Sequence, residues 1–278
     1  MIIRKIFITI FGMLLSETVI AKDLKIDAGD GISWQPEQKR YYATGRVRII
    51  RGDATSWSDQ ARAYYDNDPD VISRIELEGH VRYLRGNLEI EGDFADIVPN
   101  EEDVLITGKK PRLKNGETVV TVNESLQYQG KEQVVFARGD ALLVDGLNKI
   151  ASQKMKGILR PDGDSGHQVL TKAYFEGNVR GSDGNSSTAN TLYIEGERGV
   201  YHADEEWMRV CGNSRILRGG DVMLGECAHY GLVSKNFRFL TEASLETPLP
   251  AVQLPNAAVK AKPEPTEKRT RMVLKTKN

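Results

Sequence analysis

The chain has 278 residues, a net charge of −1 with histidine neutral, 40% hydrophobic residues, two cysteines and four histidines. Five of its ten prolines, and seven Lys/Arg against two Asp/Glu, lie after residue 246. The remainder is therefore acidic, which argues against a surface that binds nucleic-acid phosphates. His80, His167, His202 and His229 lack the spacing of a metal site, so we expect them on the solvent face or in turns, with no cofactor.

The chain begins with the pattern of a secretory signal peptide. Arg4 and Lys5 precede an apolar run at residues 6–15, and small or aliphatic residues follow at 19–21. This run is about half the roughly 20 residues that a membrane-spanning helix needs. We expect residues 1–21 to be cleaved and the protein to be periplasmic. An uncleaved membrane anchor is the alternative.

Residues 22–246 carry an internal repeat. Four units share one spacing, in which a glycine is followed six residues later by Arg-Gly or Asp-Gly and thirteen residues later by a small residue; they begin at Gly45, Gly79, Gly139 and Gly212. Looser copies surround Gly108 and Gly177, so the starts lie 29 to 38 residues apart, a period typical of repeat architecture.

Each unit reads as a β-hairpin. Apolar and polar residues alternate on both sides of the Arg-Gly or Asp-Gly step, and glycine there accepts the positive φ of a turn. No comparable segment has the periodicity of a helix, so we expect an all-β fold with a twisted antiparallel sheet folded over on itself. The opening glycine of each unit is expected to point inward, where the sheet curves.

The alternation defines one apolar and one wet face. The apolar residues of the first arm are expected either to pack as a core or to leave part of the interior open for an apolar guest. These candidate groove residues are Val47, Ile49, Val81, Tyr83, Ala141, Leu143, Val179 and Ile216.

Several polar patterns have simple structural explanations. Glu89, Glu91, Asp93 and Asp96 could imitate a glycosidase acid/base pair, but their spacing favours the wet face of a strand, so we expect no enzyme. The sequence from Asp162 to Gly166 resembles a fragment of a calcium loop without its closing Glu, and is expected to be a turn.

The two cysteines lie on opposite arms of one predicted hairpin. Cys211 and Cys227 are symmetric about Gly219, so a three-residue loop would bring them together as a disulfide in an exported protein. A shift of register by one residue would prevent this pairing. Two reduced thiols are therefore the alternative.

The C-terminal segment, residues 247–278, is rich in proline and lysine and has almost no apolar periodicity. We expect it to be a disordered tail. It could contact an anionic membrane or partner, or have no function.

Four phrases together resemble the OstA-like lipopolysaccharide transport proteins of the periplasmic LptA type. They are DAGDGISWQPEQKRYYATGRVRIIRGD (27–53), LEGHVRYLRGN (77–87), VFARGDALLVDG (135–146) and RVCGNSRILRGG (209–220). The resemblance spans the whole body of the chain. It departs from the family in Ala141 and Ser214 at apolar positions, in Gly181 at an inward one, and in the cysteine pair and basic tail.

This resemblance implies a V-shaped, open-ended β-jellyroll whose interior binds the lipid A acyl chains of lipopolysaccharide on the way from inner to outer membrane. It also implies end-to-end homo-oligomers and docking to an inner-membrane jellyroll and an outer-membrane translocon. Edge strands near residues 24–34 and 233–245 would serve that docking by strand addition. The alternatives are a polysaccharide-acting enzyme on a parallel β-helix and a membrane-anchored jellyroll of the same transport system.

Overall fold

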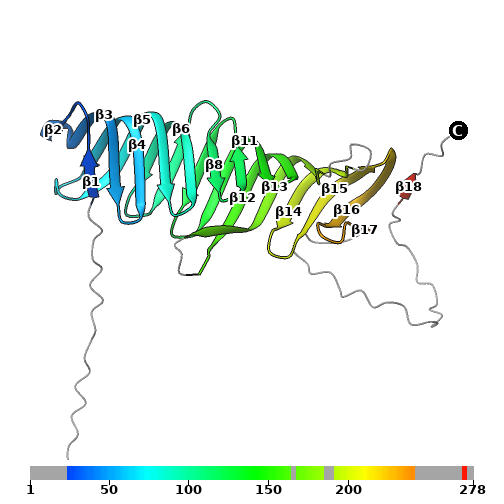
Figure 1. Ribbon diagram of the computed structural model, residues 1–278. Helices are drawn as coiled ribbons and strands as arrows, with labels where there is room; N and C mark the ends of the chain where they lie inside the picture. The colour runs from blue at the N-terminus through cyan, green and yellow to red at the C-terminus, as the bar shows by residue number, and fades with distance from the viewer. Residues whose placement is uncertain (1–23, 164–166, 185–190, 242–270, 274–278) are drawn as a thin grey trace, which may run out of the picture.

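The computed structural model describes residues 24–163, 167–184, 191–241 and 271–273, which form β-strands joined by short turns. Its one helical element among these residues is a 3-10 turn, η1 (Pro36–Gln38). The strands lie side by side along one long axis, from β1 and β2 at one end to β16 and β17 at the other (Figure 1). The strands are β1 (Leu24–Asp27), β2 (Gly31–Gln35), β3 (Arg40–Arg51), β4 (Ala54–Tyr65), β5 (Ile72–Arg85), β6 (Leu88–Val98), β7 (Asp103–Thr107), β8 (Arg112–Asn115), β9 (Thr118–Thr121), β10 (Ser125–Gln129), β11 (Val134–Asp145), β12 (Asn148–Pro161), β13 (Gln168–Ser182), β14 (Tyr193–His202), β15 (Trp207–Arg218), β16 (Asp221–Gly231), β17 (Phe237–Leu240) and β18 (Arg271–Val273).

Every strand pair in this sheet is antiparallel. The all-β expectation is therefore confirmed, and the parallel β-helix that the enzyme alternative required is wrong. Hairpins of 10 to 15 residues per strand predominate because alternating β-branched and polar residues suit a half-buried sheet.

The long strands bend in the middle, at a β-bulge that follows the opening glycine of the unit. In β3 the ladder breaks between Thr44 and Val47, where Gly45 (φ 80°) and Arg46 (φ 46°) both adopt left-handed conformations. The same break occurs in β5, β11, β13 and β15. Such a bulge turns the strand sharply, so each long strand contributes one half to each of two walls.

The two walls are defined by the two halves of β3. The first wall is the half before the bulge (residues 40–44), together with the segments that pair with it along the sheet. The half that follows it (residues 47–51), with its paired segments, is the second wall. The bulges form a corner along one side of the molecule, where the chain itself passes from wall to wall. Along the opposite side the hairpin turns of the two walls meet.

The opening glycines do not face the interior as expected. A Cβ added to Gly139 would overlap Glu124 of the neighbouring strand, and one added to Gly79 would overlap the exposed Asp59. Two consecutive left-handed residues rotate the pleat, so the inward alternation restarts only two positions after the glycine. The glycine makes room for a polar side chain at the outer corner.

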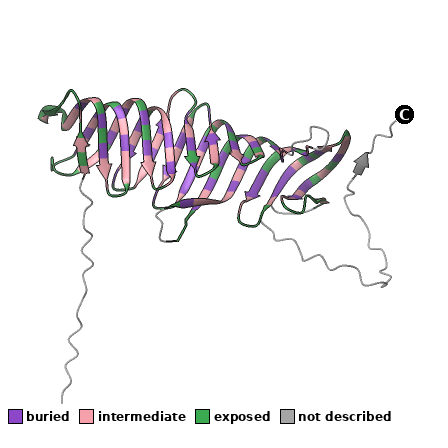
Figure 2. Ribbon diagram, viewed as in Figure 1, coloured by how far each residue is buried: buried purple, intermediate pink, exposed green. Residues whose placement is uncertain are grey.

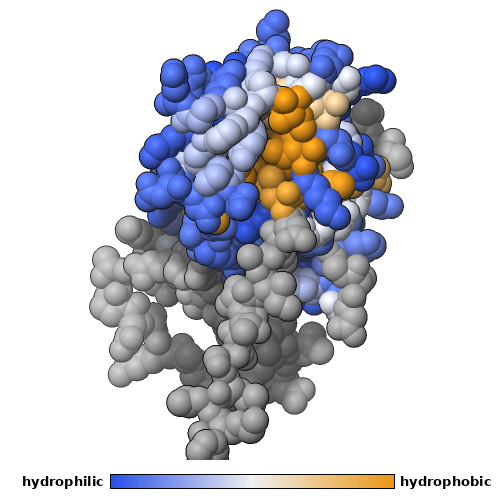
Figure 3. Space-filling model, turned by 90° about the vertical axis from the view of Figure 1, so that its left-hand side faces the viewer, coloured by the Kyte–Doolittle hydropathy of each residue, from blue (hydrophilic) through white to orange (hydrophobic). Residues whose placement is uncertain are grey.

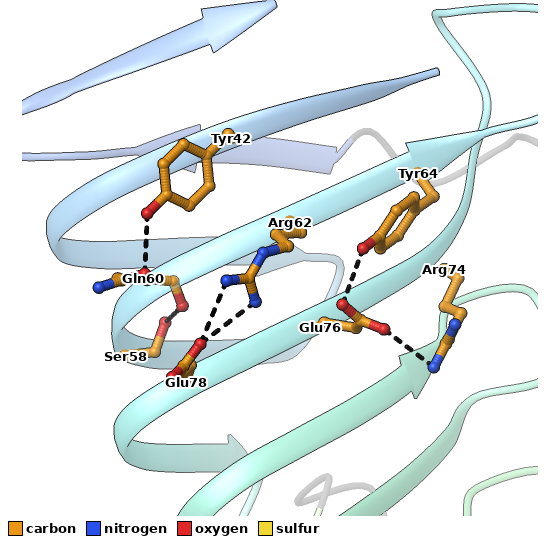
Figure 4. A network of polar contacts seen from close by, with 8 residues as sticks. All are labelled: Tyr42, Ser58, Gln60, Arg62, Tyr64, Arg74, Glu76 and Glu78. Atoms are coloured by element: carbon orange, nitrogen blue, oxygen red, sulfur yellow. Dashed lines mark hydrogen bonds and ion pairs between the residues drawn. The ribbon is translucent and has the colours of Figure 1, made fainter. Parts of the chain in front are cut away.

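Beyond the corner, the predicted alternation is confirmed. More and less buried residues alternate along most of the long strands (Figure 2), and one continuous apolar cluster fills the space between the walls. The outer face carries polar ladders across strands. On β4 and β5, Arg62 bonds Glu78 at 3.2 Å, the Tyr64 hydroxyl donates to Glu76 at 2.8 Å, and Arg74 pairs with Glu76 at 3.0 Å (Figure 4).

The repeat is irregular where a long strand is replaced by two short ones. β7 and β8 pair with the two halves of β6, and β9 and β10 pair with the two halves of β11. Pro111 lies between β7 and β8, and proline cannot donate to a ladder. β1 and β2 divide the edge of β3 in the same way.

The chain ends lie partly outside the described residues. The expected signal peptide, 1–21, lies wholly outside them, as does most of the expected disordered tail. Residues 271–273 of that tail differ from the expectation, because they form β18 on the second-wall half of β16. An edge strand offers free backbone groups to any extended segment, which accounts for this pairing.

Candidate functional site: the apolar interior and its mouth

The eight candidate groove residues all lie between the walls. Each is at most 4% exposed, and all belong to the continuous apolar cluster. They come from the second-wall halves of β3, β5, β11, β13 and β15. Successive units therefore place equivalent side chains side by side, and the repeat produces an apolar lining along the length of the molecule.

The lining is closely packed. A cavity of about 50 Å³ lies between the walls beside Ile49, Ile75, Tyr83 and Arg85. A site for a drug-sized ligand usually measures roughly 300–1,000 Å³. Among the described residues, the walls are therefore close together, and a guest between them would have to replace contacts that the lining makes with itself.

The N-terminal end is hollow. A depression of about 630 Å³ opens there and is lined by Leu24, Ile26, Ile32, Val71 and Ile72 among others. Ile32 is 49% exposed and Val71 is 51% exposed. Viewed along this end, an apolar strip runs between hydrophilic flanks (Figure 3). A contiguous apolar patch on a soluble domain marks an interaction surface.

Edge strands frame both ends of the ribbon. Within the described part of the chain, β1 and β2 pair only with β3, and β17 pairs only with β16. The two segments that we expected to serve as docking edges thus contain β1, β2 and β17. Trp34 of β2 is 59% exposed, and its indole N–H donates to the Tyr65 hydroxyl at 2.9 Å.

The positions that depart from the family pattern are accommodated locally. Ser214 is fully buried, and its hydroxyl donates to the carbonyl of Val210 at 2.5 Å. Gly181 faces Ile194 and Met208, whose atoms would lie 2.8 to 3.0 Å from an added Cβ. A flexible Met fills the space that the missing side chain leaves, so the lining continues past Gly181.

Two buried tyrosines give the lining a polar element. The rings of Tyr83 and Tyr128 lie 6.3 Å apart. Burial raises the pKa of the Tyr83 hydroxyl, so this group stays neutral. The Tyr128 hydroxyl bonds the Gln168 side chain, with the amide nitrogen 2.9 Å away. Because Gln168 begins β13, the Tyr128 hydroxyl lies near the side of the molecule where the hairpin turns meet.

The carboxylates that could imitate a glycosidase pair lie on the outer face, where each has a basic or backbone partner. Glu89 pairs with Arg82, Asp96 with Arg74, and Asp93 accepts from the Lys109 amide at 2.6 Å. Glu91 lies 3.6 Å from the Arg112 guanidinium. Carboxylates that are paired in this way are typical of a solvated sheet face.

Two histidines depart from the expected solvent exposure. The ring of His202 stacks on Trp207 at 4.0 Å, and that of His229 lies 5.1 Å from the same indole. Burial, assisted by Arg209 and Arg238, lowers the pKa of His229 to about 4. Trp207 covers both rings because β14, β15 and β16 are adjacent.

The predicted cysteine pair forms a disulfide between β15 and β16. Cys211 and Cys227 lie directly opposite each other in the ladder.

The described residues contain no group of His, Cys, Asp and Glu side chains that could hold a metal ion. They also contain no helix with the length and hydrophobicity to span a membrane. Of the expected turn from Asp162 to Gly166, residues 164–166 lie outside the described part of the chain.

Comparison with known proteins finds similarity among solved structures. No family model matches the sequence, and no curated protein matches it. The chain is similar to a solved structure described as LptH, the LptA homologous periplasmic component of the lipopolysaccharide transport device from Pseudomonas aeruginosa. The two share 12% identity with a TM-score of 0.40, over 48% of this chain and 90% of that one.

Sequence reasoning missed how the residues before the hairpin turns are used. Arg51, Arg85, Asp145 and Arg218 were recognised as a recurrent element, but only as turn signals. In the structure their side chains reach the opposite wall. A hairpin turn requires only the glycine. The recurrence of a charged residue immediately before that glycine was therefore the available signal that these residues have a second role.

Proposed function

We propose that this protein is a periplasmic carrier that binds the lipid A acyl chains of lipopolysaccharide between its two walls and passes them from the inner toward the outer membrane. Its mature form would be residues 22–278 after removal of the signal peptide. The observation that carries the proposal is the continuous apolar lining contributed by equivalent positions of successive repeats.

The energetics favour such a site. Each methylene removed from water contributes about 0.8 kcal/mol, so a chain of roughly a dozen carbons costs on the order of 10 kcal/mol to expose. A lining that runs from end to end lets a chain move along it without being exposed again. A bound acyl chain must separate lining side chains that pack against each other, so the net affinity for the chain stays moderate. A carrier that must release its cargo needs a moderate affinity.

The ends of the ribbon support a bridging role. We call the apolar depression at the N-terminal end the mouth. This mouth and the edges of β1 and β2 that are unpaired within the described part of the chain suit addition of a strand from a second jellyroll. We infer that copies join end to end, and that the terminal copies dock to an inner-membrane jellyroll and an outer-membrane translocon. The backbone pairing of one sheet would then continue into the next.

The test is binding of rough lipopolysaccharide to a matched pair of variants. Val81 is 2% exposed in the lining, whereas Val144 lies on the outer face of β11. Val81→Asp should weaken binding at least tenfold because an unpaired carboxylate would lie beside the acyl chains, and Val144→Asp should bind normally. Circular dichroism verifies that both variants are folded, and Val81→Ala is the milder substitute. Equal binding by folded Val81→Asp and Val144→Asp would exclude the interior as the site.

A further inference from the structure

The side of the molecule opposite the corner is closed by a row of polar contacts between the walls. Apart from the unit that begins at Gly108, each unit ends its second-wall strand with a charged residue at the turn, and each of these residues bonds the first wall. The contacts are Arg51 with Asn100 at 3.0 Å and with the Pro99 carbonyl, Arg85 with Glu102 at 2.5 Å, Asp145 with the Tyr201 hydroxyl at 2.7 Å, Asp183 with the Tyr230 hydroxyl at 2.7 Å, and Arg218 with the Lys235 carbonyl at 3.4 Å.

A further pair of hydrogen bonds reinforces this row near its middle. The Asn87 amide donates to the Gln168 carbonyl at 2.8 Å, and its oxygen accepts from the Gln168 N–H at 2.7 Å. Asn87 lies in the turn between β5 and β6, and Gln168 begins β13. The two residues are 81 positions apart in sequence, so this pair joins distant repeats across the two walls.

The two long sides of the molecule are joined in different ways. At the corner, the backbone of each long strand passes from one wall to the other, so the walls cannot part there without losing strand pairing. On the opposite side, the hydrogen bonds that join the walls among the described residues all involve a side chain. Each such contact adds little net stability because water can replace either partner. If the walls separate anywhere, they separate along this row, which we call the latch side.

The interior gives a reason for such a separation. The cavity between the walls is about 50 Å³ and is bordered by Arg51, Arg85 and Glu102 of the latch side. An acyl chain therefore needs the walls to move apart before it can occupy this space. Tyr201 and Tyr230 belong both to the apolar cluster and to the latch contacts, which couples displacement of the lining to release of the latch.

We propose that the latch side is the entrance through which acyl chains reach the interior, and that the repeated Arg-Gly and Asp-Gly residues hold it shut until a ligand displaces their partners. This inference rests on the proposed function, because it concerns how that ligand enters. It assigns the repeat motif a role beyond making turns, and it predicts sideways loading rather than threading from an open end.

A cross-link over the latch side tests the entrance. Asn87→Cys with Gln168→Cys, joined by a short bis-maleimide, ties the walls together, while the native cysteines remain protected as a disulfide. The matched control is Glu76→Cys with Asp96→Cys, two residues directly opposite each other on the outer face of the first wall. Uptake of BODIPY-labelled rough lipopolysaccharide from self-quenched micelles is followed by stopped-flow fluorescence.

We expect the latch cross-link to slow uptake at least tenfold, with the control cross-link loading as the unmodified protein does. The uncross-linked double variant lacks the Asn87 side chain of the latch contact and should load at least as fast as the unmodified protein. Equal rates for both cross-linked proteins would show entry from the ends and overturn the latch, while leaving the proposed function intact. No uptake by the unmodified protein would overturn the proposed function and the latch with it.

A second pair of variants tests the latch without a cross-link. Tyr201→Phe combined with Tyr230→Phe removes two latch hydroxyls and keeps both rings, and should accelerate uptake roughly three- to tenfold with the final amount unchanged. Tyr42→Phe is the control, because this hydroxyl bonds Gln60 at 2.8 Å on the outer face of one wall. An unchanged rate in the double variant would contradict the latch.

Discussion

His80 and His229 differ in their environments, and this difference separates their pKa values. The His80 ring hydrogen-bonds the Asp59 carboxylate at 2.8 Å at an exposed corner, which raises its pKa. Burial, together with Arg209 and Arg238, lowers the pKa of His229 to about 4. Polar residues on the outer face of this sheet are therefore not uniformly solvated, and local partners determine their charge.

We predict that the two histidines titrate on opposite sides of the ordinary value of about 6.5. The His80 pair stabilises the fold below that pH, and its contribution is lost as pH rises through the raised folded pKa. His229 has the opposite effect, because the unfolded chain binds its proton first and stability falls between about pH 6.5 and about pH 4. NMR titration of the ring protons measures both.

Asp59→Asn is the control for that titration. It should lower the pKa of His80 toward 6.5 and leave that of His229 unchanged, since its lowered pKa has other causes. A His80 titration that is the same with and without the Asp59 carboxylate would contradict the assigned pairing.

At the scale of one strand, the decisive feature is the bulge at which it crosses from wall to wall. Gly139 of β11 has φ 83°, and its carbonyl accepts a hydrogen bond from the backbone N–H of Asn123 at 2.6 Å. An added Cβ would lie 2.8 Å from the backbone nitrogen of Glu124. The glycine thus permits both the left-handed conformation and the close approach of the neighbouring chain.

Gly139→Ala should destabilise the fold more than Gly146→Ala in the turn of the same hairpin. Gly146 has φ 57° and nothing within 4 Å of an added Cβ, so its substitution costs only the left-handed conformation, roughly 1–2 kcal/mol. Gly139→Ala adds the overlap with Glu124, roughly 1–3 kcal/mol more. Urea denaturation compares the two free energies of unfolding, and equal losses would show that the corner has room to relax.

The sequence predicts what is local and periodic in these elements. The burial of Val47 and Ile49 follows from the period of two. The three-residue loop expected between the cysteines is wrong, because Arg218 pairs with Asp221 across a two-residue turn, and the register shift between Cys211 and Ser214 brings Cys211 opposite Cys227.

The orientation of Gly139 was not predicted, because it depends on a second left-handed residue, Asp140. Asp, Asn and His adopt that conformation more readily than other residues with side chains, so His80, Asn178 and Asn213 at the equivalent positions were the available signal.

The partners in the contacts between the walls could not be predicted from the sequence either. Asn87 and Gln168 are far apart in sequence, and their meeting depends on the sharpness of every intervening bend. The shielding of His202 by Trp207 depends in the same way on the order of adjacent strands.

At the scale of the whole molecule, the fold is a ribbon with a closed corner, a latched side and two ends with free strand edges. The N-terminal end adds an apolar hollow of about 630 Å³. The sides and ends therefore have separate tasks in this account. We propose that the latch side admits the ligand and that the ends join one copy to the next.

The N-terminal mouth should govern end-to-end association. Ile32→Glu combined with Val71→Glu places two charges in the apolar strip and should weaken self-association at least tenfold. Leu147→Glu is the control, because Leu147 is 66% exposed in the turn between β11 and β12, away from both ends. Sedimentation velocity over a range of concentrations measures the effect, and equal weakening by both changes would contradict a role for the mouth.

The central claim is that acyl chains lie between the walls. Leu142 and Leu143 are neighbours on β11, one 36% exposed on the outer face and the other fully buried in the lining. We would place the photo-crosslinking residue p-benzoylphenylalanine at each position in turn, irradiate the protein with rough lipopolysaccharide, and identify the adducts by mass spectrometry. The account predicts a lipid A adduct from position 143 and none from position 142. Adducts from position 142 alone, or from both positions equally, would contradict it.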